Sequence, residues 1–222
     1  MTLYHGGNKI KSDNEFGVFY GNRAIKKIYK GSTLVYEVGT IFEATSGSKT
    51  VTLPEGNYYL ILVGGGGGAG QVTGNVSEGG PGGSGACVKL KVHLMPGTYT
   101  LNGAAAGITG YDGTAGGTAS IILNGTTLAS AGGGGGGQHG QGSLYAGHGY
   151  GGAAGVYNIS SSLAVLQTVL ATNGIKGTDS YHTTQGVPGK SVANLADYPN
   201  AGRGSNPRQQ NSGAGYCLLQ VL

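Results

Sequence analysis

The side chains that could do chemistry in this chain are few and far apart in the sequence. Three histidines, His139, His148 and His182, are candidate metal ligands, because imidazole nitrogen is a common ligand of zinc. No Cys, Asp or Glu is spaced around His139 and His148 as a metal site would require. We therefore expect no metal site and no cofactor.

The sequence also offers little for catalysis. The stretch GVPGKS at 186–191 imitates the end of a phosphate-binding loop, but the first glycine of G-x-x-x-x-G-K-[ST] would fall on Thr184, and no apolar strand precedes it. A G-x-S-x-G nucleophile elbow is missing from the sequence. Only nine acidic residues are present, so a carboxylate pair for glycoside cleavage has few candidates. We expect the protein not to be an enzyme.

Glycine dominates the composition, with 49 of 222 residues. Disordered chains combine low hydrophobicity with high charge, whereas this chain is 38% hydrophobic and carries a net charge of only +4. Collagen is excluded because the glycines do not recur at every third position and only six prolines are present. These features predict an ordered body built from glycine.

Charge and hydropathy narrow the classes of partner. The sequence pI is about 9.0, yet the basic residues are scattered apart from a group between Arg23 and Lys30, so we expect no nucleic acid partner. No stretch approaches eighteen apolar residues, and no secretory signal opens the sequence, so we expect no membrane insertion. Cys87 and Cys217 are compatible with two reduced thiols or with one long-range bridge.

Residues 1–39 differ from the rest and predict an N-terminal attachment segment. Two runs rich in β-branched and aromatic residues, Ala24–Tyr29 and Thr33–Val38, flank a Lys-Gly-Ser turn and predict a β-hairpin. Because a lone hairpin is marginal in water, it must dock onto the body or onto a partner. The candidate docking side chains are Ile25, Ile28, Tyr29, Leu34, Val35 and Tyr36.

Residues 40–222 repeat one pattern, in which a strand, a turn and a second strand lead into glycines. The turns are Pro54-Glu55-Gly56, Met95-Pro96-Gly97 and Asn124-Gly125, the last being the strongest hairpin signal in the chain. We expect hairpins at one end of the body and glycine runs at the other. Apolar residues at helical spacing in 163–172 predict the one helix.

The glycine runs have two interpretations, flexible linkers or packed polyglycine II helices. Gly-rich chains are usually flexible, but here apolar strands lead into the runs. Left-handed helices with three residues per turn have no internal hydrogen bonds, so adjacent backbones would have to satisfy one another. We expect a mainly β fold, with β-hairpins or a small sandwich, packed polyglycine II helices, loops and at most one short helix.

Four stretches carry a family resemblance: NYYLILVGGGGGAG, GGSGACVKLKVHLMPGTYTL, DGTAGGTASI and LASAGGGGGG. Together they resemble the glycine-rich domain of tail fibre and tail tip proteins of tailed bacteriophages, over about residues 40–222. The chain is similar, more loosely, to the tip adhesins of T-even-like phages, whose body is a sandwich of polyglycine helices. The resemblance implies that loops between glycine runs contact a bacterial receptor. This chain differs in having no Trp and in beginning with a short hairpin.

The tyrosines fit such a binding role. There are 14 Tyr against 3 Phe, and Tyr supplies large amphipathic contact area with few rotatable bonds. The alternative is that the tyrosine rings simply cover glycine backbone. The candidate receptor-binding residues are Tyr145, His148, Tyr150, Tyr157, Tyr181, His182, Tyr198, Arg203 and Arg208.

We therefore expect a receptor-binding adhesin at the tip of a phage tail fibre, made in the cytoplasm of the host bacterium and carried on the virion. Its partners would be a bacterial surface protein or polysaccharide and a tail fibre or other virion protein, with a homotrimer left open. The alternative is a structural virion component such as a tail, collar or head decoration. A glycine-rich matrix or cell-surface protein is disfavoured by the missing signal sequence.

Overall fold

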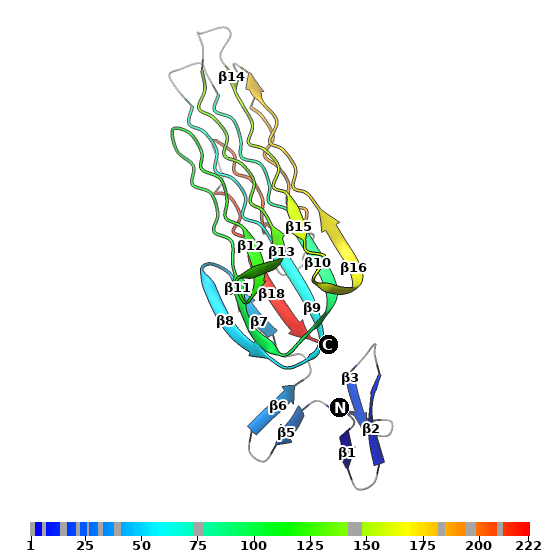
Figure 1. The fold of residues 1–222 in the computed structure, drawn as a ribbon. Helices are drawn as coiled ribbons and strands as arrows, with labels where there is room; N and C mark the ends of the chain where they lie inside the picture. The colour runs from blue at the N-terminus through cyan, green and yellow to red at the C-terminus, as the bar shows by residue number, and fades with distance from the viewer. Residues whose placement is uncertain are drawn as a thin grey trace.

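The structure is a computed structural model that describes residues 3–5, 8–13, 17–20, 23–25, 27–30, 33–37, 41–72, 78–141, 148–181, 185–193, 199–207 and 211–222. For the strands before residue 41 and for His148 it describes the backbone alone. The protein is mainly β, and the described residues contain no helix (Figure 1).

The N-terminal segment holds more strands than the sequence predicts. β1 (Leu3–His5), β2 (Asn8–Asp13), β3 (Gly17–Tyr20) and β4 (Arg23–Ile25) form an antiparallel sheet in chain order. β5 (Lys27–Lys30) and β6 (Thr33–Glu37) form the predicted hairpin. The predicted strand 24–29 is divided, because Arg23–Ile25 pairs with β3 instead.

The six candidate docking residues are distributed over these strands. Ile25 belongs to β4, while the other five belong to the β5–β6 hairpin, namely Ile28, Tyr29, Leu34, Val35 and Tyr36. Among the described strands, β1 to β6 pair only with one another. Their role in attachment stays a prediction.

Two five-stranded antiparallel sheets form a sandwich at one end of the body (Figure 1). The first sheet has the order β16 (Ala164–Thr172), β10 (Cys87–Leu94), β9 (Gly56–Val63), β18 (Tyr216–Val221), β7 (Ile41–Ala44). The second has the order β15 (Tyr157–Ile159), β13 (Thr126–Ala131), β12 (Ala119–Leu123), β11 (Gly97–Asn102), β8 (Ser48–Leu53).

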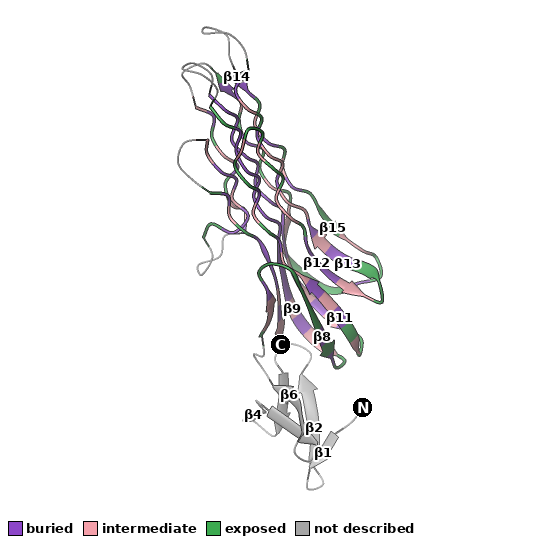
Figure 2. Cartoon of the chain, turned by 90° about the vertical axis from the view of Figure 1, so that its left-hand side faces the viewer, coloured by how far each residue is buried: buried purple, intermediate pink, exposed green. Residues whose placement is uncertain are grey.

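Alternating apolar residues build the core between the sheets. Leu60 and Leu62 of β9 and Leu90 of β10 pack in one cluster with Leu101 and Ile121 of the second sheet, and all five are fully buried (Figure 2). The outer face of the first sheet is also covered. There a second apolar cluster joins its strands to Val192, Ala193 and Ala201, and its buried members are Ile61, Val63, Cys87, Ala193, Ala201 and Tyr216.

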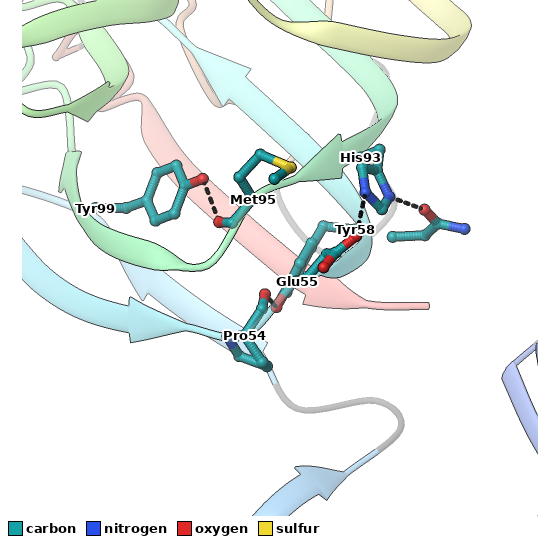
Figure 3. A network of polar contacts seen from close by, with 7 residues as sticks. Pro54, Glu55, Tyr58, His93, Met95 and Tyr99 are labelled. Carbon is teal, nitrogen blue, oxygen red and sulfur yellow. Dashed lines mark hydrogen bonds and ion pairs between the residues drawn. The ribbon is translucent and has the colours of Figure 1, made fainter. Parts of the chain in front are cut away.

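The two turns predicted as hairpins carry the chain between the sheets instead. The turn at Pro54 leads from β8 of the second sheet to β9 of the first, and the turn at Pro96 leads from β10 back to β11. A buried tyrosine closes each crossing (Figure 3): Tyr58 Oη donates to the carbonyl of Pro54 at 2.8 Å, and Tyr99 Oη donates to that of Met95 at 2.7 Å. Both rings therefore serve packing and turn geometry.

The Asn124-Gly125 turn is a true hairpin turn, as predicted. It joins β12 to β13, which pair with each other. Asn124 has φ 50° and Gly125 has φ 79°, and two successive positive values define the type I′ turn that matches the twist of paired strands.

The predicted helix at 163–172 is wrong, because Ala164–Thr172 form β16. The strand pairs with β10, and register shifts leave Leu166 and Val169 as extra residues. A bulge inserts one extra residue into a strand, so side chains on one face of β16 are three residues apart at the bulges instead of two. Apolar positions with this spacing resemble those of a helix. Val165, Thr168, Val169 and Thr172 are β-branched and favour a strand.

The glycine runs are packed polyglycine helices, and the linker interpretation is wrong for the described residues. Gly64, Gly67 and Gly70 donate backbone N–H groups at 2.9 Å to Ala86, Gly83 and Gly80 respectively. The neighbouring positions Gly65 and Gly68 donate to another segment, at Gly117 and Thr114. This three-residue period is the one that a helix with three residues per turn imposes on each of its sides.

The absence of side chains is what lets these helices approach one another. A Cβ on Gly134 would lie 2.1 Å from the carbonyl oxygen of Gly83, and one on Gly67 would lie 1.9 Å from that of Gly135. The obstructing atoms are backbone and cannot rotate away. Figure 1 shows the segments lying side by side between the sandwich and β14, and we call this bundle of residues 64–72, 78–86, 103–118, 132–141, 149–156, 173–181, 185–193, 199–207 and 211–215 the glycine lattice.

A methyl group inside the glycine lattice should destabilise the fold. We expect Gly134→Ala to lower the free energy of unfolding by about 3 kcal/mol or more, at or above the upper end for overpacked positions, because backbone must move. Gly110→Ala is the matched control, since the nearest atom to its Cβ would be the Asp112 carbonyl oxygen at 3.3 Å. Thermal unfolding followed by circular dichroism measures both, and equal melting temperatures would contradict a packed lattice.

The two cysteines are free and buried, so the long-range bridge is not formed. Cys87 on β10 and Cys217 on β18 lie on opposite sides of β9 and in different apolar clusters. Two strand spacings of ~4.8 Å separate the backbones, too far for a disulfide. Burial raises the pKa of Cys87 to about 11 and that of Cys217 to about 12, from 9.0.

These thiols predict alkaline destabilisation. Above pH 9 the unfolded chain ionises both thiols while the folded chain keeps them protonated, so stability should be constant from pH 7 to 8 and then fall. The slope can reach ~1.4 kcal/mol per pH unit for each thiol. Urea unfolding at pH 7, 8, 9 and 10 measures it. The Cys87→Ala, Cys217→Ala double variant should show a shallower decline between pH 9 and 10, and an unchanged slope would assign the effect to other groups.

Candidate functional site

The glycine lattice ends, away from the sandwich, in turns and in one short strand pair. β14 (His148–Gly149) pairs with β17 (Ser180–Tyr181), and β14 lies at the opposite end of the body from the sandwich strands (Figure 1). We call residues 108–113, 138–141, 148–150 and 180–181 the far end. The chain enters the body at the other end, where Ile41 of β7 pairs with Gln220 near the C-terminus.

Four neighbouring segments bring an aromatic side chain each to the far end. Residues 111–117 bond to 132–140, these bond to 149–156, and these bond to 173–179, through backbone pairs such as Gly113 to Gly137, Gln138 to Tyr150 and Gly177 to Gly152. The aromatic side chains, in the same order across the lattice, are Tyr111, His139, Tyr150 and Tyr181. The tyrosines are 61%, 47% and 59% exposed in that order. We call these four residues the aromatic row.

Tyr111 is held in place although most of its ring is exposed. Its ring stacks on that of His139, with centroids 3.9 Å apart and planes inclined by 25°. The turn that carries it is closed by Thr114, whose hydroxyl accepts the N–H of Ile108 at 2.7 Å. The Tyr111 carbonyl accepts the N–H of Gln71 at 3.1 Å, which ties the turn to a further segment of the lattice.

Asp112 fixes the histidine on which Tyr111 stacks. Its Oδ1 lies 2.7 Å from His139 Nδ1 and accepts the backbone N–H of His139 at 2.9 Å. The His139 side chain is 16% exposed, whereas that of Asp112 is 56% exposed. The hydrogen bonds from His139 lower the pKa of the Asp112 carboxyl. Asp112 therefore stays ionised at neutral pH and presents a negative charge beside the Tyr111 ring.

The segment that carries Tyr181 is anchored by polar contacts beneath it. The buried hydroxyl of Ser180 donates to the Gly79 carbonyl at 2.8 Å and accepts the N–H of Gly186 at 2.8 Å. Asp179 accepts the N–H of Gly151 at 2.9 Å, which joins this segment to the one bearing Tyr150. The backbone beneath Tyr150 and Tyr181 is therefore held by side-chain hydrogen bonds in addition to the backbone bonds of the lattice.

The structure brings some of the predicted receptor-binding residues together and not others. Tyr150, Tyr181 and the backbone of His148 lie at the far end. Tyr157 lies on β15 in the sandwich. Arg203 is half-buried in the glycine lattice, where its backbone packs directly against Gly66. The remaining four lie outside the described residues, namely Tyr145, His182, Tyr198 and Arg208.

Sequence reasoning missed Tyr111 and Asp112 and set His139 aside for want of a nearby carboxylate. Asp112 is 27 residues away along the chain, and the lattice places it in contact. The available signal was the stretch GITGYDG, where Tyr-Asp interrupts two glycine-rich segments. Within the described residues no three His, Cys, Asp or Glu side chains are grouped so as to hold a metal ion.

A second polar cluster lies at the sandwich end and serves the turns there. His93 Nδ1 lies 2.8 Å from Asn57 Oδ1, and His93 Nε2 lies 3.4 Å from Glu55 Oε1 (Figure 3). Glu55 lies in the turn before β9 and Asn57 lies at the start of that strand, next to the crossing that Tyr58 closes. The contacts hold this crossing against β10.

No protein-family model matches the chain, and no curated protein matches it in sequence. The part of the chain that the structure describes contains no helix long and apolar enough to cross a membrane.

Removing the Asp112 carboxylate should loosen the aromatic row. We expect Asp112→Ala to weaken the Tyr111–His139 stacking, since two hydrogen bonds to His139 are lost, while the melting temperature changes little because the site is exposed. The ring protons of Tyr111, measured by nuclear magnetic resonance, should move toward solvent-exposed values. Glu55→Ala is the control, as it removes a carboxylate from a histidine at the other end. Unchanged Tyr111 shifts in Asp112→Ala would show that the carboxylate does not position the ring.

Proposed function

We propose that this protein is the receptor-binding adhesin at the tip of a bacteriophage tail fibre, and that it acts by binding without catalysis. The observation that carries the proposal is the aromatic row, whose three tyrosines are about half exposed or more at the far end. Large exposed rings on an ordered scaffold are typical of recognition surfaces, where they add contact area at little entropic cost. The resemblance of residues 40–222 to phage tail fibre proteins supports the same function.

The positions of the two termini of the body support the proposed function. Residues 1–39 connect to β7 in the sandwich, so they are tethered at the end of the body opposite the aromatic row. In the proposed arrangement this segment docks on a fibre or other virion protein, and the row faces the bacterium. Several copies per virion would add avidity of ~10²–10⁴ where their sites engage together.

Binding to bacteria tests the proposal. Labelled full-length protein should be retained by cells of the host bacterium, and a Tyr111→Ser, Tyr150→Ser, Tyr181→Ser variant should lose at least tenfold in apparent affinity. Tyr157→Ser is the matched control, because Tyr157 is 38% exposed but lies on the sandwich. Circular dichroism establishes that all the proteins fold.

Two outcomes would contradict the proposal. Equal retention of the parent and the triple variant would remove the aromatic row from recognition. Retention of the parent by no cell type that the virus infects would favour the alternative, a structural component of the tail, collar or head.

A further inference from the structure

We infer that the aromatic row binds a saccharide chain of the bacterial surface. This inference rests on the proposed function, since it names the ligand class of the same surface.

The row is too small to act as a protein–protein interface by itself. An aromatic side chain offers ~150–250 Å² in all, so three tyrosines that are about half exposed or slightly more, together with a mostly buried His139, present roughly 400 Å² at most. Specific protein–protein interfaces bury ~800 Å² on each partner. A ligand that contacts single rings in succession needs no such area.

The spacing of the row suits an extended polymer. Hydrogen-bonded neighbouring backbones lie ~5 Å apart, so the four segments, each bonded to the next, follow one another at steps of ~5 Å from Tyr111 to Tyr181. A chain of linked sugar rings can follow these steps and contact one aromatic residue after another.

The chemistry of the row matches a sugar ring. Tyr combines an apolar ring face with a hydroxyl at its rim, and sugars likewise combine a face of C–H groups with a rim of hydroxyls. Asp112 supplies a carboxylate beside Tyr111, and hydrogen bonds to an ionised acceptor are about twice as strong as neutral ones. Gln138 is exposed next to His139 and adds an amide. The row thus combines aromatic faces on which sugar rings can stack with polar groups that can accept hydrogen bonds from sugar hydroxyls.

Weak individual contacts suffice because the row is ordered before it binds. The Asp112 contacts orient His139, His139 holds Tyr111, and the lattice fixes the backbone beneath all four residues. Ordering a free side chain on binding would cost ~0.5–1.5 kcal/mol each. A saccharide ligand, which offers few strong contacts, benefits most from avoiding that cost.

The first experiment uses cells that retain the labelled full-length protein. One sample is oxidised with periodate, which cleaves the vicinal diols of sugars, and another is digested with proteinase K. We expect periodate to abolish retention and proteinase K to leave it unchanged. Retention that survives periodate but is lost after proteinase K would overturn the saccharide inference and leave the proposed function standing. Retention by no cells at all would overturn the proposed function and this inference with it.

The second experiment identifies the source of the saccharide and tests whether Tyr111 contacts it. The glycan released by mild acid from lipopolysaccharide of the same cells, and their capsular polysaccharide, are added separately as competitors. One of them should inhibit retention, and failure of both would overturn the inference. Tyr111→Leu should need at least tenfold more of the active glycan for half-saturation, whereas Tyr111→Phe, which keeps the ring and loses only the hydroxyl, should lose less affinity than Tyr111→Leu, and Tyr157→Leu, on the sandwich, should match the parent. Equal affinity for Tyr111→Leu would remove the stacking contact from the mechanism.

Discussion

The backbone hydrogen bond between neighbouring glycine helices is the interaction on which the rest of this structure depends. An extended three-residue helix bonds nothing within itself, so each N–H and C=O must find a partner on another segment. At the closest contacts only a residue without a Cβ fits, as the 2.1 Å from a Cβ on Gly134 to the Gly83 oxygen illustrates. Each bond contributes a net ~0.5–1.5 kcal/mol, and their number offsets the entropy lost when glycine is ordered.

The sandwich solves the problem of starting such a lattice. Glycine helices have no apolar side chains that could determine which segments become neighbours. The positions of β9, β10 and β12, in contrast, are determined by the packing of their side chains in the core. Once β9 and β10 pair, the run after Val63 and the run before Cys87 begin side by side, with Gly64 donating to Ala86 at 2.9 Å. The register of the strands thereby sets the register of the glycines. The buried rings of Tyr58 and Tyr99 fix the crossings between sheets, so a few large side chains order a body that is mostly backbone.

The sequence predicted local structure far better than it predicted which segments meet. The Asn124-Gly125 turn and the strands that run into glycine could be identified because their signals lie within a few residues. The partners of β8 and β9 could not, since a turn in sequence looks the same whether it joins paired strands or crosses to another sheet. The bulges in β16 place its apolar residues at a spacing that resembles that of a helix, so the sequence predicted a helix there. The Asp112–His139 contact was hidden because the two residues are brought together by lattice packing and by no local motif.

A lattice of this kind separates the residues that specify the fold from those that could recognise a ligand. Large side chains do not fit at the close backbone contacts between helices, so they lie on the outer faces of the lattice or where a segment ends or turns, as Tyr111 and Tyr181 do. Their substitution leaves the bonds beneath them intact, because those bonds join backbone to backbone. A surface built in this way can change its chemistry without changing its support. That independence is what a recognition surface under changing selection requires, and it follows from the absence of Cβ atoms in the segments below.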